Sequence, residues 1–211
     1  MTAEPVVFGA GYSVYVRIVR LTLEEKGVAY RLEPIDVFAP DGLPTSYRDR
    51  HPFGKIPAFE HDGFRLFETS AIARYVDEGF DGPALQPADP RSRARMNQAI
   101  GLLDSYGYRA MVWDIYVERV SRPRDGEMSD EAKIAAALPV AKTCLDVLER
   151  LSPQSLWLAG DALTLADLHT APMIAYFVKA PEGAAMLGRY PRLSGWWQAI
   201  SARPSFTATA D

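Results

Sequence analysis

A proline opens a hairpin pattern in the N-terminal part of the chain. The runs PAFEH (57–61) and FRLFE (64–68) both alternate in polarity, and the Asp-Gly dipeptide between them is a strong two-residue turn signal. Proline donates no backbone hydrogen bond, so Pro57 must stand at the first residue of a strand, at an edge or at a bulge. The Ile56–Pro57 bond can also be cis at modest cost. The pattern therefore predicts a strand with a sharply bent entrance.

The elements around this hairpin follow a definite order. A short apolar run (5–8) precedes a segment with helical spacing (13–27), and a second extended run (29–37) follows. A strand–helix–strand unit implies a parallel pair with a right-handed crossover. An irregular segment (38–53) leads to the hairpin, and a helix ending near Gly79 closes this part. We therefore expect the order βαβ-ββα, an α/β domain.

Beyond this part the sequence reads as helical. Residues 79–90 hold two glycines and three prolines, a density of breakers typical of an interdomain linker. We predict an α/β domain over residues 1–82, a linker over 83–90 and an all-helical domain over 91–211.

Four helices are expected in the second domain. They are a long helix over 90–121, a second capped by Ser129 and kinked by Pro139, a third starting at the capping box of Thr164 and Asp167, and a last one ended by Pro204.

Composition excludes several functions. The net charge of −4 provides no basic surface for nucleic acid or anionic membranes. The N-terminus lacks the features of a signal peptide, and no apolar run is long enough to span a membrane. The single cysteine, Cys144, allows no internal disulfide, which favours a cytoplasmic location. It lies in an apolar helical stripe, which favours a core position. The three histidines have no metal-ligand spacing, so no metal is expected.

Several stretches, in this order and spacing, resemble the cytosolic glutathione transferases of the serine type, phi-like or a related bacterial class. They are FGAGYSVYVRIVRLTLEEKG (8–27), HPFGKIPAFEHDG (51–63), LFETSAIARYV (66–76), and LAGDALTLADL (158–168) with a closing YPRLSGWWQAISARPSF (190–206). The resemblance implies a thioredoxin-like N-terminal domain, an all-helical C-terminal domain, glutathione as co-substrate and a homodimer. It also identifies Pro57 with the family's cis proline, where the preceding residue pairs with the cysteinyl backbone of glutathione.

Ser13 is the candidate catalytic residue. It stands at a helix start, beside free backbone N–H groups and the positive end of the helix dipole, where a thiolate is stabilised. The resemblance aligns it with the hydroxyl that donates to the glutathione sulfur. A structural N-cap is the alternative reading of the same residue. Tyr12 is the rival donor, because tyrosine serves in other classes of the family.

The remaining clamp residues are also assigned by the resemblance. Glu68 resembles the partner of the glutamyl ammonium group, and Thr69 offers a hydroxyl at a helix start that can bind a carboxylate; otherwise Thr69 is a helix cap. Ile56 would offer its backbone and Lys55 its charge. The loop APDGLPTSY (39–47) lacks the basic pair of the phi class, so Lys55 or His51 would have to hold the glycyl carboxylate.

The electrophile is expected in an apolar site between the domains. Tyr12 and Phe38 would contribute from the first domain, and Tyr108 and Val112 from one face of the long helix. Trp113 and Tyr116, on another face, are candidates for the dimer contact.

The expected function is conjugation of glutathione to an apolar electrophile. Two alternatives remain open at this point. One is another glutathione-dependent reaction, by an isomerase, a dehalogenase or an ether-cleaving lyase. The other is a non-catalytic interaction module of the same fold.

Overall fold

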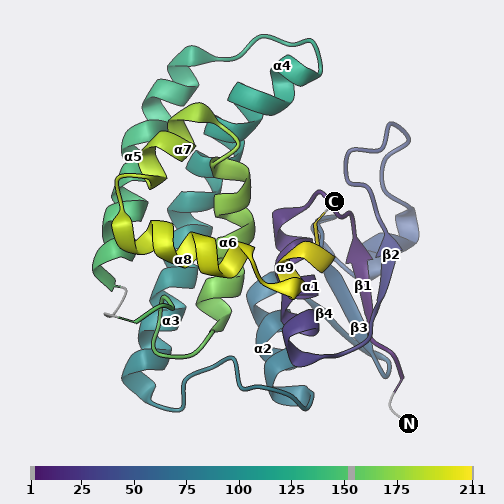
Figure 1. Ribbon diagram of the computed structural model, residues 1–211. Helices are drawn as coiled ribbons and strands as arrows, with labels where there is room; N and C mark the ends of the chain where they lie inside the picture. Colours follow the sequence, from purple (N-terminus) through teal and green to yellow (C-terminus); the bar gives the residue numbers. More distant parts are fainter. Residues whose placement is uncertain (1–2, 152–154, 211) are drawn as a thin grey trace. The chain divides into compact units, whose positions relative to one another are not determined.

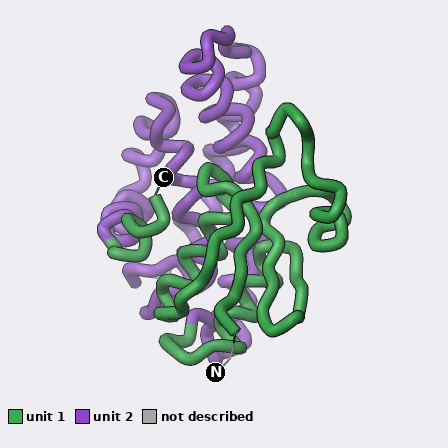
Figure 2. Tube along the Cα trace, turned by 90° about the vertical axis from the view of Figure 1, so that its right-hand side faces the viewer, with its two compact units in different colours: residues 1–84, 203–211 green, residues 85–202 purple. Residues whose placement is uncertain are grey.

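The computed structural model describes residues 3–151 and 155–210, which form two compact units (Figure 2). Unit 1 comprises residues 1–84 and 203–211, and unit 2 comprises residues 85–202. The division falls inside the predicted linker. Lys26 Nζ donates to the Pro83 carbonyl at 3.1 Å in unit 1, whereas Leu165 donates its N–H to the Leu85 carbonyl at 2.9 Å in unit 2. The grouping of residues 203–211 with unit 1 differs from the predicted organisation.

Unit 1 is built on a four-stranded sheet in the order β2-β1-β3-β4. Its strands are β1 (Val6–Gly9), β2 (Arg31–Pro34), β3 (Ala58–His61) and β4 (Phe64–Phe67). The β1–β2 pair is parallel, as the crossover predicts, and the other two pairs are antiparallel. Strand β2 is shorter than the extended run predicted over 29–37, although the Ile35 N–H just beyond its end still bonds the Gly9 carbonyl at 3.1 Å.

Two long helices complete this sheet domain (Figure 1). They are α1 (Val14–Lys26) and α2 (Thr69–Gly79), which pack against each other and bury one apolar core with the sheet. Gly27 ends α1 in the left-handed conformation at φ 68°. A 3₁₀-helix, η1 (Thr45–Asp49), lies within the segment predicted to be irregular, and the short helix α9 (Pro204–Ala208) contacts α1. The thioredoxin-like order βαβ-ββα is confirmed.

The regular elements of unit 2 are all helices among the described residues, as predicted, and an isolated β-bridge joins Trp157 and Gly160. Its elements are α3 (Pro90–Leu102), η2 (Leu103–Ser121), α4 (Arg122–Arg124), α5 (Glu131–Leu151), α6 (Leu165–Phe177), α7 (Pro181–Leu187) and α8 (Pro191–Ser201). The long helix predicted over 90–121 consists of the α-helix α3 followed directly by the π-helix η2. At the end of η2 the Arg122 N–H bonds the Val117 carbonyl, five residues back, as in a π-helix. Helix α6 is buried on almost every side and forms the centre of the unit.

Helix starts in unit 2 test the capping predictions. The capping box of Thr164 and Asp167 is present at the start of α6. The predicted cap Ser129 is wrong by one residue, because the Asp130 carboxylate accepts the Lys133 N–H at 3.0 Å and the Asp130 carbonyl accepts the Ile134 N–H. A carboxylate reaches the first-turn N–H groups as well as a hydroxyl does. Helix α5 continues through Pro139.

Cys144 is a core residue, as its apolar stripe predicts. It is 1% exposed, and burial raises the pKa of its thiol to about 11. No helix among the described residues is long and apolar enough to cross a membrane.

Candidate active site

The strand register brings the predicted clamp to one end of the sheet. Phe8 in β1 lies opposite Ala58 in β3, and Ala58 lies opposite Phe67 in β4. The turn that follows β1, the residues that precede β3 and the residue that follows β4 are therefore neighbours. Ser13, Ile56 with Pro57, and Glu68 occupy these positions. They are far apart in the sequence but lie at the same end of the sheet.

The entrance of β3 carries an unpaired stretch of backbone. The Ile56–Pro57 peptide is cis, which confirms the prediction at Pro57. The buried Tyr47 hydroxyl donates to the Lys55 carbonyl at 2.8 Å and so anchors the residue before. Among the described residues, none bonds the backbone N–H or carbonyl of Ile56, whose side chain is buried. A peptide-like ligand can therefore pair with Ile56 as an added strand.

Gly9 allows α1 to begin close to this backbone. A Cβ at Gly9 would lie 2.3 Å from Val16 Cγ2 and 3.4 Å from Ile56 Cβ. The first distance is far below van der Waals contact, so any larger residue would push the first turn of α1 away from β1. The absence of a side chain at Gly9 thus places the start of α1 beside Ile56.

Ser13 is the N-cap of α1. It has φ −76° and ψ 124°, its Oγ accepts the Val16 N–H at 3.4 Å, and its carbonyl accepts the Arg17 N–H at 2.9 Å. The cap bond is long, and it uses only a lone pair of the hydroxyl. No acceptor among the described residues takes the hydroxyl proton, so Ser13 retains a donor at a helix N-terminus.

The rival donor, Tyr12, is differently engaged. Its hydroxyl donates to Asp36 Oδ1 at 2.6 Å, and the same oxygen accepts the Phe38 N–H at 2.9 Å. Burial and the Asp36 carboxylate both raise the pKa of Tyr12, while the Tyr12 hydroxyl holds the pKa of Asp36 below its ordinary value. The Tyr12 hydroxyl proton is therefore already donated to Asp36, whereas that of Ser13 is not taken by any described residue. This difference favours Ser13 as the donor to a thiol. Asp36, just beyond β2, is a residue that sequence reasoning missed.

Tyr12 and Phe38 form an exposed aromatic pair. Their ring centroids are 5.8 Å apart, and Phe38 is 64% exposed. The bond from Tyr12 to Asp36 fixes one ring and the Asp36–Phe38 bond fixes the backbone of the other. The two predicted acceptor residues of unit 1 are thus brought together.

Glu68 and Thr69 form the start of α2. Glu68 occupies the N-cap position with φ 72° and ψ 110°, and its carbonyl accepts the N–H groups of Ala71 and Ile72 at 3.0 Å. Thr69 is therefore the first helical residue and not the cap, which corrects the structural reading of its sequence. A left-handed glutamate costs backbone energy and is typical of ligand clamps. No acceptor among the described residues takes the N–H of Thr69, so this helix start suits a carboxylate.

His51 lies behind the clamp. It is 3% exposed, its ring lies 5.0 Å from that of Phe67, and its Nδ1 is buried with no partner among the described residues. Burial lowers the pKa of His51 below its ordinary value of 6.5; the Glu68 charge opposes this shift and Lys55 adds to it. His51 is thus mainly neutral at neutral pH, and the exposed Lys55 is the available cation.

The other two predicted acceptor residues lie on η2 in unit 2. Val112 is 6% exposed, and burial raises the pKa of the partly buried Tyr108. Their role stays a prediction. Trp113 is 36% exposed, whereas Tyr116 is buried and packs on Tyr176 with ring centroids 4.6 Å apart.

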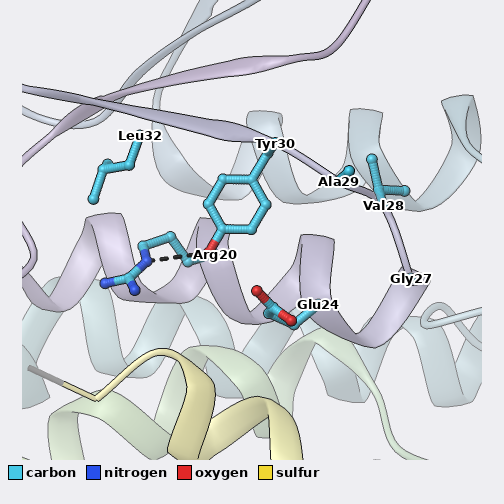
Figure 3. Close-up of a pocket in the computed structure, with 7 residues that line it drawn as sticks. All are labelled: Arg20, Glu24, Gly27, Val28, Ala29, Tyr30 and Leu32. Carbon is cyan, nitrogen blue, oxygen red and sulfur yellow. Dashed lines mark hydrogen bonds between the residues drawn. The ribbon is translucent and has the colours of Figure 1, made fainter.

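A separate hollow of about 490 Å³ lies between α1 and the segment leading into β2 (Figure 3). In it the Arg20 Nε donates to the Tyr30 hydroxyl at 3.2 Å, with Glu24 beside them. None of the predicted site residues lines this hollow. No cluster of three or more potential metal ligands occurs in the described parts of the chain.

Comparison with known proteins identifies the family of both parts of the chain. The family model of the glutathione S-transferase N-terminal domain matches residues 7–84, and that of the C-terminal domain matches residues 108–204. Glutathione S-transferase 4 of Zea mays is 32% identical over 97% of this chain and 91% of its own. Glutathione S-transferase F13 of Arabidopsis thaliana is 30% identical over 95% of this chain and 92% of its own.

The solved structures that are similar to this chain are also glutathione transferases. Glutathione S-transferase III in its apo form superposes with a TM-score of 0.86 at 30% identity, covering 98% of this chain and 95% of that one. Glutathione transferase F7 from Populus trichocarpa gives a TM-score of 0.85 at 30% identity, with 97% of each chain covered. With both family models matched in order and relatives of this similarity along nearly its whole length, the chain belongs to the glutathione S-transferase family.

Proposed function

We propose that this protein is a glutathione transferase in which Ser13 donates a hydrogen bond to the sulfur of glutathione. One observation carries the proposal. Groups with free hydrogen-bonding capacity gather at one end of the sheet: the Ser13 hydroxyl proton, the Ile56 backbone and the Thr69 N–H. They match a tripeptide that offers a thiol, a central backbone and a carboxylate.

The clamp holds the tripeptide along its length. The N–H and carbonyl of Ile56 pair with the cysteinyl backbone, and Pro57 fixes the bend that presents them. The γ-glutamyl carboxylate lies at the start of α2 on Thr69, and its ammonium group pairs with Glu68. The glycyl carboxylate pairs with Lys55, because the loop over 39–47 offers no base.

Catalysis consists of thiol acidification and positioning. An ordinary thiol has a pKa of about 8.5, and each unit of lowering needs about 1.4 kcal/mol of preference for the thiolate. A hydrogen bond from Ser13 to the anion contributes roughly 1.5–3 kcal/mol, enough for one or two units. The thiol proton passes to solvent. The thiolate then forms a carbon–sulfur bond with an electrophilic carbon, either displacing a leaving group or adding to an activated double bond.

The electrophile is apolar and contacts an aromatic surface. Tyr12 and Phe38 offer such a surface in unit 1, and the assignment of Tyr108 and Val112 to the electrophile stays a prediction. One solved relative, glutathione S-transferase I from maize, is described in complex with an atrazine–glutathione conjugate. That ligand joins a flat ring to the glutathione sulfur, and we propose substrates of this general class.

The assembly is proposed to be a homodimer in the cytoplasm. The large side chains Phe53 (71% exposed) and Trp113 (36% exposed) are candidates for burial against a second copy of the chain. The single, buried Cys144 suits a reducing compartment. Sedimentation velocity of the protein and of a Phe53→Ser variant tests the dimer; a monomeric parent protein contradicts it.

A non-catalytic role is the second candidate, and the loop over 39–47 favours it, because it carries Asp41 and no basic residue. Calorimetric titration with glutathione at neutral pH separates the two. Micromolar to millimolar binding supports the transferase. No heat, together with no thermal shift at high glutathione, supports the interaction module.

The catalytic assignment needs a variant pair. In Ser13→Ala we expect kcat/KM for an aryl halide to fall about tenfold to hundredfold, the equivalent of the lost hydrogen bond, while glutathione binding persists. Tyr12→Phe is the matched control, since it removes the rival hydroxyl and keeps the ring. Full activity in Ser13→Ala with loss of activity in Tyr12→Phe would reverse the assignment.

A further inference from the structure

The C-terminal segment folds back onto the helix that begins with Ser13. Residues 203–210, which include α9, belong to unit 1 although unit 2 precedes them in the chain. Figure 1 shows α9 in yellow against α1 in purple, and Figure 2 colours the segment with unit 1. The segment is held to α1 at two places, one near each end of the helix.

The first attachment is at the C-terminal end of α1. Arg203 donates from Nε and Nη2 to the two carboxylate oxygens of Glu25, both at 2.6 Å, and the Ser205 hydroxyl donates to the same carboxylate. The Glu25 side chain is 7% exposed. A bidentate pair of this kind, with its carboxylate buried, has fixed geometry. It sets the position of α9 along α1.

The second attachment is in the first turns of α1, at Arg17. Its Nη2 donates to the Phe206 carbonyl at 2.9 Å, its Nε donates to the Thr209 hydroxyl at 3.4 Å, and its Cζ lies 4.0 Å from the centre of the Phe206 ring. Thr209 is fully buried, and its hydroxyl donates to the Ser205 carbonyl at 2.9 Å. The guanidinium is thus held by two hydrogen bonds and by a ring face.

Arg17 connects this contact to Ser13. The Arg17 N–H bonds the Ser13 carbonyl at 2.9 Å, which is the first hydrogen bond of the helix. The only other bond that fixes Ser13 to the first turn is the long one of 3.4 Å from Val16 to its Oγ, within the described residues. Terminal turns of helices open most readily. The buried Val16 holds one side of the first turn, and the contacts of Arg17 hold another.

We propose that the segment from Arg203 to Thr209 is a brace for the catalytic helix, and that Arg17 is a positioning residue for Ser13. The inference rests on the proposed function, because it assigns the brace the task of holding the Ser13 hydroxyl at the glutathione sulfur. Arg17 does not touch the substrate. It acts by keeping the first turn of α1 closed, so that the donor is in place before the thiol ionises.

The experiment compares Arg17→Gln with Arg20→Gln. Both remove one positive charge from α1, but Arg20 bonds the Tyr30 hydroxyl and lies one turn further along. In Arg17→Gln we expect faster amide hydrogen exchange in the peptide covering residues 12–20, a rise in the apparent thiol pKa from the pH dependence of kcat/KM, and about a tenfold loss of kcat/KM at neutral pH, which corresponds to one pKa unit. Arg20→Gln should change none of these.

Two further variants guard against a merely structural effect. Arg17→Lys keeps a donor for the Phe206 carbonyl and should restore most of the thiol pKa. Arg203→Gln, at the far end of the brace, leaves the surroundings of Ser13 unaltered and should still speed exchange in residues 12–20. A deletion of residues 203–211 would remove the whole brace but could prevent folding. Single substitutions such as these avoid that problem.

The outcomes separate the two proposals. Unchanged exchange and an unchanged pH profile in Arg17→Gln, with normal turnover, overturn the brace and leave the transferase intact. Absence of glutathione binding in the unaltered protein overturns the proposed function and the catalytic task of the brace, whereas the exchange data still decide whether the segment holds the first turn.

Discussion

Replacing Asp167 should destabilise unit 2 more than any other single carboxylate change. The side chain is fully buried at the start of α6 and accepts four hydrogen bonds. Oδ1 accepts the Leu158 N–H at 2.8 Å and the Trp196 indole N–H at 2.9 Å; Oδ2 accepts the Thr164 N–H at 2.7 Å and the Thr164 hydroxyl at 2.8 Å. Burial raises the pKa of Asp167, and the four donors oppose this shift by favouring the carboxylate.

The expected magnitude follows from the donors left behind. In Asp167→Ala the two backbone N–H groups and the indole N–H stay buried without partners, while the Thr164 hydroxyl can rotate. Each orphaned donor costs at least about 1 kcal/mol, and the lost side-chain volume adds to this, so we expect a loss of about 4 kcal/mol. In Asp167→Asn the amide nitrogen must face two donors whichever way it is turned, and we expect a loss of about 2 kcal/mol.

Tryptophan fluorescence during urea unfolding measures this loss selectively, because all four tryptophans lie within residues 85–202. With a urea dependence of about 2 kcal/mol per molar, the midpoint should fall by about 2 M in Asp167→Ala and about 1 M in Asp167→Asn. The exposed Asp161 provides the control, and Asp161→Asn should leave the midpoint almost unchanged. A shift in Asp167→Ala as small as that of the control would refute the hydrogen-bond reasoning.

Three further predictions concern the clamp and the charge network of unit 2. Glu68→Gly should raise the free energy of unfolding by about 1 kcal/mol, since glycine adopts φ 72° without strain, and should abolish glutathione binding; urea unfolding and calorimetry measure the two effects. Tyr12→Phe should retain more than about a third of kcat/KM, against the larger loss in Ser13→Ala; a similar loss in both variants would contradict the assignment. The hydrogen bond from the Lys133 ammonium is the main reason that the pKa of Glu118 lies below its ordinary value of 4.5. The stabilisation that ionised Glu118 gives the folded protein is therefore complete above pH 4.5, and it is lost as the pH falls through the lowered pKa. The stability difference between the parent and Glu118→Gln should therefore shrink on acidification, as urea midpoints across a pH series will show.

Much of the architecture follows from local sequence patterns. The βαβ-ββα order, the bent entrance at Pro57 and the ends of α1 at Ser13 and Gly27 all depend on turn and capping chemistry within a few residues. Such signals are contained in short windows. They therefore locate the ends of elements, and the residues proposed for the clamp lie at those ends.

The features that escaped prediction depend on distant partners. Asp36 is bonded by a tyrosine 24 residues away, and Arg17 bonds a carbonyl 189 residues away. Neither residue differs locally from an ordinary surface charge. The switch to π-helical bonding in η2 also has no local signal, because helical spacing predicts a helix without distinguishing its hydrogen-bond register.

The return of the chain to α1 also bears on how the protein is made. The Glu25–Arg203 pair joins residues 178 positions apart, so it cannot form until Arg203 has left the ribosome. The N-terminal domain is thus synthesised first and completed last, with all of unit 2 produced in between. A nascent chain stalled before residue 203 should contain a nearly complete sheet domain in which α1 still lacks its final contacts.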